Sequence, residues 1–177
     1  VVNPIVKGGN DKLKTEVLEA VDRAARELTD FLPHELVPKT GINIAFAMPE
    51  AAGPEQIAAV NGRMTVHNGL LVKNGEAKLG AAEQLSYILL EIMKHDPKQR
   101  SIMNLRYEKD VYQIIEEVGF SIGNVDRKKK GSIADSTKDM VKACKGVPDI
   151  IVDKSDSTLR IIGKDPDDVL DKLENIL

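Results

Sequence analysis

Aromatic residues are scarce in this sequence of 177 residues. They make up 3% of the chain, and tryptophan is absent. Proteins that bind single-stranded nucleic acid stack its bases on aromatic side chains, so the composition argues against that class. The formal net charge of -3 also gives no broad positive field for a polyanion. We therefore expect no direct contact between this domain and nucleic acid.

Cysteine and long apolar runs are almost absent as well. Cys144 is the single cysteine, so no disulfide framework can form, and we expect a reducing, cytoplasmic compartment. Its position in residues 140–144 indicates a buried helix residue rather than a nucleophile, because no activating base is evident. No apolar run approaches the ~18 residues that a membrane helix needs, and there is no signal peptide. Because the chain opens at Val1 rather than methionine, we expect it to be part of a longer polypeptide.

What the chain does have is enough apolar sequence for a core. Hydrophobic residues make up 42% and charged residues 30%, a balance typical of folded proteins. A chain of this length fits one domain, and it needs no disulfide or structural metal to bury a core. We therefore treat residues 1–177 as a single domain.

Apolar spacing and turn signals predict alternating helices and strands. Helices are expected over residues 11–31, 53–60, 81–93, 108–118, 136–144 and 165–177. Strands are expected over residues 42–48, 120–125, 149–153 and 158–163, with a hairpin over 62–73 turning at Asn68-Gly69. Residues 74–75 read as a turn leading to Gly80, and residues 102–105 as a brief apolar segment. Gly8-Gly9 is expected to form a turn before the first helix, and Asp135 or Ser136 to cap the helix at 136–144. The predicted fold class is α/β, a mixed β-sheet covered by helices.

Generic catalytic and metal-binding motifs are missing. The chain has no Walker loop, no GxGxxG after a strand, no GxSxG and no HExxH. Its three histidines, His34, His67 and His95, are far apart and lack the spacing of metal ligands. No metal site is therefore predicted from the residues.

Four segments place charged, amide or hydroxyl side chains at the ends of expected elements. They contain Arg63, then Asn104 and Arg106, then Asp126 and Arg127, and finally Ser136 and Thr137. Arginine can hold phosphate through two parallel hydrogen bonds, and Ser or Thr at a helix start can present donors to an anion. The basic run at residues 127–130 is itself interpreted as a solvated loop, although Arg127 directly follows a strand end, where α/β folds place ligand contacts.

Short segments in a fixed order resemble the ThiN-type thiamine-phosphate synthase family, which is known mainly from archaea. The resemblance runs from about Leu36 to the C-terminus. It rests on the segments at residues 41–45, 57–63, 79–81, 96–100, 103–107, 126–127, 136–137, 148–151 and 160–166.

The resemblance implies a concrete activity and site. Enzymes of the family join hydroxymethylpyrimidine diphosphate to a thiazole phosphate and release pyrophosphate, a reaction that could use Mg²⁺ with the diphosphate. Asn43 and Asp149 join the four segments as expected ligand-binding residues. Arg63 matches the first residue of the family's catalytic pair. The domain is often fused behind a pyrimidine-phosphate kinase. In some archaeal regulators it instead follows a DNA-binding helix-turn-helix and itself senses thiamine phosphates, and a homodimer is a further option.

The sequence departs from the enzyme pattern where the family helix usually opens Gly-Ala-Ser-Arg-His. Here Glu83 stands in place of Arg, and Gln84 in place of the catalytic His. Lys138-Asp139 replaces the family's Trp-Gly, and residues 154–157 replace its Gly-Lys-Glu-Pro. Glutamine cannot donate a proton as an acid, so we expect binding of thiamine phosphate or its precursors with impaired catalysis. Two alternatives remain: an active synthase that uses another acid, and an interaction domain that has lost its ligand.

Overall fold

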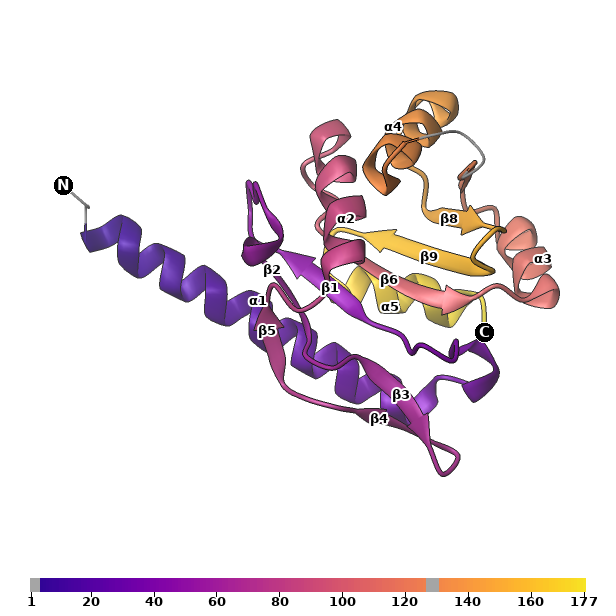
Figure 1. Ribbon diagram of the computed structural model, residues 1–177, viewed down its shortest axis with the longest axis horizontal. Coiled ribbons are helices and arrows are strands. Elements are labelled where there is room, and N and C mark those ends of the chain that lie inside the picture. Colours follow the sequence, from indigo (N-terminus) through magenta and orange to yellow (C-terminus); the bar gives the residue numbers. More distant parts are fainter. Residues whose placement is uncertain (1–3, 127–130) are drawn as a thin grey trace.

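A seven-stranded mixed sheet organises the computed structural model, which describes residues 4–126 and 131–177. The strand order is β5-β2-β1-β6-β9-β8-β7 (Figure 1). The strands are β1 (Ile44–Ala47), β2 (Ile57–Val60), β5 (Ala77–Leu79), β6 (Ser101–Arg106), β7 (Ile122–Asn124), β8 (Ile150–Asp153) and β9 (Thr158–Gly163). Only the β7–β8 pair among these neighbours is parallel. Strands β3 (Met64–His67) and β4 (Leu70–Lys73) form a separate hairpin.

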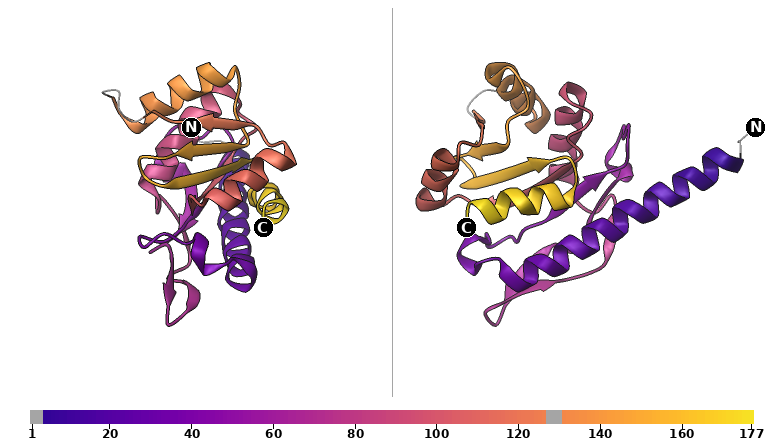
Figure 2. Two further views of the ribbon diagram at one scale, coloured as in Figure 1. Left: turned by 90° about the vertical axis from the view of Figure 1, so that its right-hand side faces the viewer. Right: turned by 180° about the vertical axis from the view of Figure 1, so that it is seen from behind.

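Helices cover both faces of the sheet, so the predicted α/β fold class is confirmed. The helices are α1 (Pro4–Phe31), α2 (Glu83–His95), α3 (Lys109–Val118), α4 (Ile133–Cys144) and α5 (Pro166–Asn175), with short 3₁₀ turns η1 (His34–Leu36) and η2 (Pro54–Gln56). Seen from behind in Figure 2, α1 and α5 lie on the near face of the sheet, while α2 and α4 lie beyond it. Within the described ranges, no helix combines the length and the apolar character needed to cross a membrane.

Strand alternation sends neighbouring side chains into two different cores. Ile44 and Phe46 of β1 pack in the core beneath α1 and α5, whereas Ala45 and Ala47 face the core under α2 and α4. The small alanines leave room for the large side chains of α2, of which Leu89 is fully buried. Because successive side chains of a strand point to opposite faces, the same sheet contributes residues to both cores.

The hairpin of β3 and β4 is held to the long first helix by a partly buried ion pair. The ammonium of Lys73 lies 2.8 Å from the carboxylate of Asp22 on α1. The same carboxylate accepts a 2.8 Å hydrogen bond from the backbone N–H of Ala77, where β5 begins. One acidic side chain of α1 therefore fixes the positions of both β4 and β5.

Several sequence predictions near the N-terminal half were wrong. Gly8-Gly9 forms no turn, because α1 begins at Pro4 and runs through both glycines. Residues 57–60 form strand β2 rather than a helix, since pairing with β1 and β5 overrides the helix propensity of Ala58 and Ala59. The turn at residues 74–75 leads to the unpredicted strand β5, and residues 102–105 belong to strand β6.

Two further predictions concern α4. This helix begins at Ile133, and its N-cap is Ser132 rather than Asp135 or Ser136. Ser132 and Asp135 form a capping box, with two reciprocal hydrogen bonds of 3.1 Å. Cys144 lies on the helix as expected, but it is exposed rather than buried, because it is the last residue of α4 and the buried face ends at Met140 and Val141.

The buried face of α2 gives a direct test of this packing. Leu89→Ala should lower the free energy of unfolding by about 3 kcal/mol, because it removes buried methyl groups and leaves a cavity. Leu70→Ala, at a hairpin position that is 68% exposed, should change it by less than about 0.5 kcal/mol. Urea denaturation of the two variants measures the contrast, and equal losses would contradict the arrangement.

Candidate functional site

A row of polar side chains crosses the centre of the sheet on the face covered by α2 and α4. Asn43 stands just before β1 and exchanges hydrogen bonds with Asn104 of β6. Asn104 pairs in register with Arg160 of β9. The residues two positions along on each strand, Ala45, Ile102 and Ile162, belong to the core beneath α2 and α4. The apolar core therefore gives way to polar groups at one end of this face.

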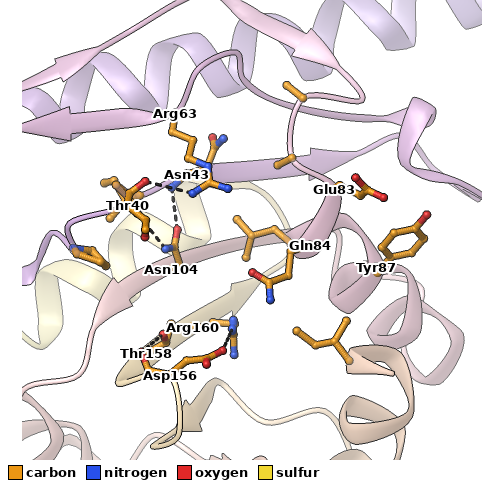
Figure 3. Close-up of a pocket in the computed structure, with 17 residues that line it drawn as sticks. Thr40, Asn43, Arg63, Glu83, Gln84, Tyr87, Asn104, Asp156, Thr158 and Arg160 are labelled. Atoms are coloured by element: carbon orange, nitrogen blue, oxygen red, sulfur yellow. Dashed lines mark hydrogen bonds and ion pairs between the residues drawn. The ribbon is translucent and has the colours of Figure 1, made fainter. Parts of the chain in front are cut away.

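A cavity of about 680 Å³ opens over this polar row (Figure 3). Its volume lies within the range of small-molecule sites. Its lining comes from Pro38 and residues 40–43, the turn at Arg63, the start of α2, Asn104 of β6, the start of α4, the β8–β9 turn and the first half of β9. Segments far apart in the sequence meet here, because the order of the strands brings their ends to one end of the sheet.

Arg63 reaches the cavity from a strained turn between β2 and β3. Its φ angle is 63°, in the left-handed region, and it follows Gly62 at 79°. That conformation costs a non-glycine residue about 1–2 kcal/mol. One guanidinium N–H donates to the carbonyl of Thr40 at 3.1 Å. Since the guanidinium has five donors, this bond orients the group at the cavity and leaves it capable of holding an anion.

Arg160 places a second positive charge on the cavity floor. Its side chain is nearly buried, and Nη1 lies 3.5 Å from Oδ2 of the fully buried Asp153. Its Nη2 lies 4.0 Å from the carboxylate of Asp156 in the β8–β9 turn. Paired carboxylates offset the desolvation of a buried guanidinium. The same pairing fixes the direction in which the guanidinium faces the cavity.

The two asparagines of the row hold the backbone as well as lining the cavity. The Asn43 amide accepts from the N–H of Val60 at 2.9 Å and donates to the carbonyl of the same residue at 2.9 Å. Asn104 accepts from the N–H of Asn43 at 2.7 Å and donates to the carbonyl of Gly41 at 3.3 Å. These side-chain hydrogen bonds satisfy backbone N–H and carbonyl groups just before β1, where regular hydrogen bonding between strands ends.

The N-terminus of α2 forms one wall of the cavity. Residues 81–85 and Tyr87 line it. The N-cap is Ala82, and no side chain of the described residues caps the helix there. The first N–H groups of a helix lack intrahelical partners and carry partial positive charge. Gln84 extends from this wall between the two arginines and Tyr87 in Figure 3.

Four of the predicted site residues line the cavity together. These are Asn43, Arg63, Gln84 and Asn104. Arg106 is two residues beyond Asn104 on the same face of β6 and pairs with Thr158, which does line the cavity. Asp126 follows the carboxyl end of β7 and is exposed. Arg127 and the basic run at residues 127–130 lie outside the described residues.

Ser136 and Thr137 occupy different positions from those expected. Because α4 begins at Ile133, both residues lie inside the helix rather than at its start. The Ser136 hydroxyl donates to the Ser132 carbonyl at 3.3 Å, and the Thr137 hydroxyl to the Ile133 carbonyl at 2.8 Å. Their backbone N–H groups are therefore not those of a helix N-terminus, and Ile133 is the α4 residue that lines the cavity.

Asp149 holds the edge of the sheet to α5. Its carboxylate accepts from the N–H and hydroxyl of Ser121 at 3.0 and 3.1 Å and lies 3.0 Å from the ammonium of Lys172. Burial raises the pKa of the Asp149 carboxyl, but the Ser121 hydrogen bonds and the Lys172 charge outweigh burial and hold this pKa below its ordinary value. These contacts give Asp149 a structural role.

Sequence reasoning assigned no role to Arg160, Asp156, Thr158, Thr40 and Tyr87, which also line the cavity. Arg160 carried a usable signal, since it stands alone as a charge between Leu159 and Ile161 in an apolar strand. A charged side chain is almost never fully buried unless it is paired, so a lone arginine in an apolar strand indicates a candidate functional residue. Tyr87 and Asp156 carried no such signal, because their positions depend on how α2 and the β8–β9 turn meet.

The described residues contain no group of three His, Cys, Asp or Glu side chains able to hold a metal ion. Glu83 and Asp156 are the carboxylates among the cavity residues. Mg²⁺ usually binds one or two carboxylates together with phosphate oxygens of a ligand. These residues would therefore fit Mg²⁺ only as an ion brought in by a diphosphate.

The sequence comparisons agree on one family. Residues 20–175 match the family model described as thiamine-phosphate synthase ThiN. The chain is 29% identical over 150 residues to the bifunctional thiamine biosynthesis protein ThiDN of Methanocaldococcus jannaschii, covering 80% of this chain and 36% of that protein. It is 26% identical over 125 residues to the thiamine-phosphate synthase ThiN of Methanothermobacter thermautotrophicus, covering 66% of each.

A solved structure extends the likeness to the whole fold. The crystal structure of the C-terminal domain of a phosphomethylpyrimidine kinase superposes with a TM-score of 0.84 at 25% identity, over 93% of this chain and 100% of that one. The chain thus spans about a third of the bifunctional relative and about two thirds of the second relative.

The Asp149 contacts predict a pH-dependent contribution to stability. A carboxyl whose folded-state pKa is depressed stabilises the fold above its unfolded pKa of about 3.9, and this stabilisation is lost as the pH falls through the folded pKa. Asp149→Asn should therefore lower the free energy of unfolding by about 1 kcal/mol at pH 7, and the difference should shrink in acid. Urea denaturation across pH measures it. Asp171→Asn, at an exposed position on α5, is the control, and equal stability of Asp149→Asn and parent at pH 7 would refute the role.

Proposed function

Since this chain belongs to the thiamine-phosphate synthase ThiN family, we propose that its cavity binds thiamine phosphate and that the domain is a weak synthase. The observation that carries the proposal is the meeting of Arg63, Arg160 and the N-terminus of α2 on one cavity. All three present N–H donors with positive charge. This is the chemistry that recognises a phosphate group.

The binding half of the proposal rests on how the donors are held. Arg63 is oriented by the Thr40 carbonyl and Arg160 by Asp153. Donors fixed before the ligand arrives lose little side-chain freedom on binding, which favours affinity. An unphosphorylated ligand would offer no anion to Arg63 and to the N-terminus of α2, so phosphorylated thiamine should bind best.

The catalytic half rests on Gln84 and Glu83. Departure of pyrophosphate is assisted by a group that donates a proton or carries positive charge. Gln84 is a neutral amide at this position and can offer only a hydrogen bond. Glu83 adds a negative charge to the same wall, which opposes a diphosphate substrate. The domain therefore keeps the means to bind a phosphate and lacks an acid that would drive turnover.

An active synthase is the second candidate, and one observation favours it. Arg63 is retained in the cavity, and the helix N-terminus beside it could stabilise a leaving pyrophosphate without a histidine. Mg²⁺ carried by the diphosphate would add further positive charge there. An upstream kinase domain would favour this candidate, and an upstream helix-turn-helix would favour a sensor.

The first test concerns phosphate recognition by Arg63. Arg63→Ala should weaken the binding of thiamine phosphate by about 1.5–3 kcal/mol, because a charge-assisted hydrogen bond is lost. Isothermal titration calorimetry gives the dissociation constants, and thiamine without phosphate should bind much more weakly to the parent. Arg23→Ala, which removes an exposed arginine on α1 across the sheet, should leave binding unchanged. Equal affinities of Arg63→Ala and parent would remove Arg63 from the site.

The second test concerns turnover. With hydroxymethylpyrimidine diphosphate and thiazole phosphate, the parent should form thiamine phosphate more slowly than about one per second, below the range of ordinary enzymes. The double change Glu83→Arg and Gln84→His should raise the rate by about 10²-fold or more, the scale of general acid catalysis. Chromatography of the product measures both rates, and Gln113→His on the exposed face of α3 controls for an added histidine. A parent rate at or above one per second would replace the weak-synthase proposal with the active-synthase one.

A further inference from the structure

The cavity carries charge of both signs: Asp156 pairs with Arg160 on one side, whereas Glu83 stands apart from both arginines on the wall formed by α2. Arg63 and Arg160 lie on one side of Figure 3, while Glu83 and Tyr87 stand together on the other, with Gln84 between the two groups. Glu83 and Tyr87 are four residues apart on α2, so they occupy the same face of the helix. The wall opposite the arginines therefore offers a carboxylate and an aromatic ring side by side.

A carboxylate beside an aromatic ring is suited to an organic cation. The carboxylate attracts the positive charge directly, and the electron-rich face of a tyrosine ring attracts it further. Both side chains are exposed at the cavity wall before a ligand binds. A bound ligand would exclude water from them and strengthen both attractions. For a ligand that is only an anion, Glu83 would be unfavourable.

Thiamine phosphate has charges of both signs at opposite ends of a short linker. Its thiazole ring nitrogen is alkylated and permanently positive, whereas its phosphate is negative. The rings of its two precursors carry no permanent charge. A ligand whose phosphate faces the arginines would present its positive ring to the remaining part of the cavity, where α2 supplies Glu83 and Tyr87.

We infer that Glu83 and Tyr87 form a cation subsite that selects the thiazolium ring of thiamine phosphate over phosphates with uncharged rings. The inference rests on the proposed function, because the phosphate must occupy the arginine side for the ring to reach α2. The inference also gives the Glu83 carboxylate a role in ligand binding. The charge that opposes a diphosphate substrate is the charge that favours the completed, cationic product.

A purely structural role for Glu83 makes a different prediction. An acidic residue in the first turn of a helix stabilises it through the helix dipole, and Glu83 is the acidic residue in the first turn of α2. Its loss would then reduce stability and affect every ligand alike. Only a cation subsite makes the effect depend on the charge of the ligand ring.

The experiment compares thiamine phosphate with its isosteric analogue in which carbon replaces the charged ring nitrogen. Isothermal titration calorimetry of the parent should show thiamine phosphate binding about three- to tenfold more tightly than the analogue. Glu83→Gln should abolish most of this preference by weakening thiamine phosphate and leaving the analogue unchanged or slightly tighter. Tyr87→Leu should reduce the preference in the same direction, and Tyr87→Phe should retain it. Glu27→Gln, an exposed change on α1, should retain the full preference.

The outcomes separate the inference from the function on which it rests. If the parent binds neither compound, the proposed function fails, and the subsite fails with it. If the parent binds both but Glu83→Gln alters them equally or not at all, the subsite is refuted while phosphate binding stands. A preference that is lost in Glu83→Gln and kept in Glu27→Gln supports the subsite.

Discussion

The buried charge of Arg160 is the constraint around which the cavity is arranged. A guanidinium in the middle of a central strand is tolerated only with a nearby carboxylate and polar neighbours, and Asp153 of the adjacent strand supplies the carboxylate. Asn104, its partner in register on β6, continues the polar surface. The apolar core beneath α2 and α4 cannot extend across this row. The cavity lies where that core stops, so its position follows from one charged residue in β9.

Helix α2 serves the fold and the site with different parts of its length. Its buried face, which includes Leu89, packs on the alanines of β1 and β2. Its first turn projects beyond that contact and forms the wall of the cavity. Residues in this turn can change without disturbing the core, because they lie past the end of the packed face. A change of residue at position 83 or 84 would therefore alter the chemistry of the cavity and leave the scaffold intact.

The sequence predicted local features well and long-range ones poorly. The hairpin at Asn68-Gly69 and the end of α3 at residue 118 were correct, because each depends on the backbone freedom of a few adjacent residues, such as the left-handed Gly119 that follows α3. Strand β2 was read as a helix, since Ala58 and Ala59 favour a helix until β1 and β5 pair with them. In the site, the resemblance to a family indicated Arg63 and Gln84. Tyr87 and the Asp156 turn could not be predicted, because their place at the cavity depends on the packing of whole elements.

At position 63, the residue that best fits the left-handed backbone differs from the residue that serves the proposed site. Glycine adopts this conformation without the steric penalty that a side chain incurs. A library of variants sorted only for thermal resistance would therefore be enriched in glycine at position 63, and the selected proteins would have lost the guanidinium for which we propose a phosphate-binding role. Engineering of this domain for thermal stability should therefore keep arginine at position 63 and change other positions. A glycine there would relieve backbone strain but remove the guanidinium from the cavity.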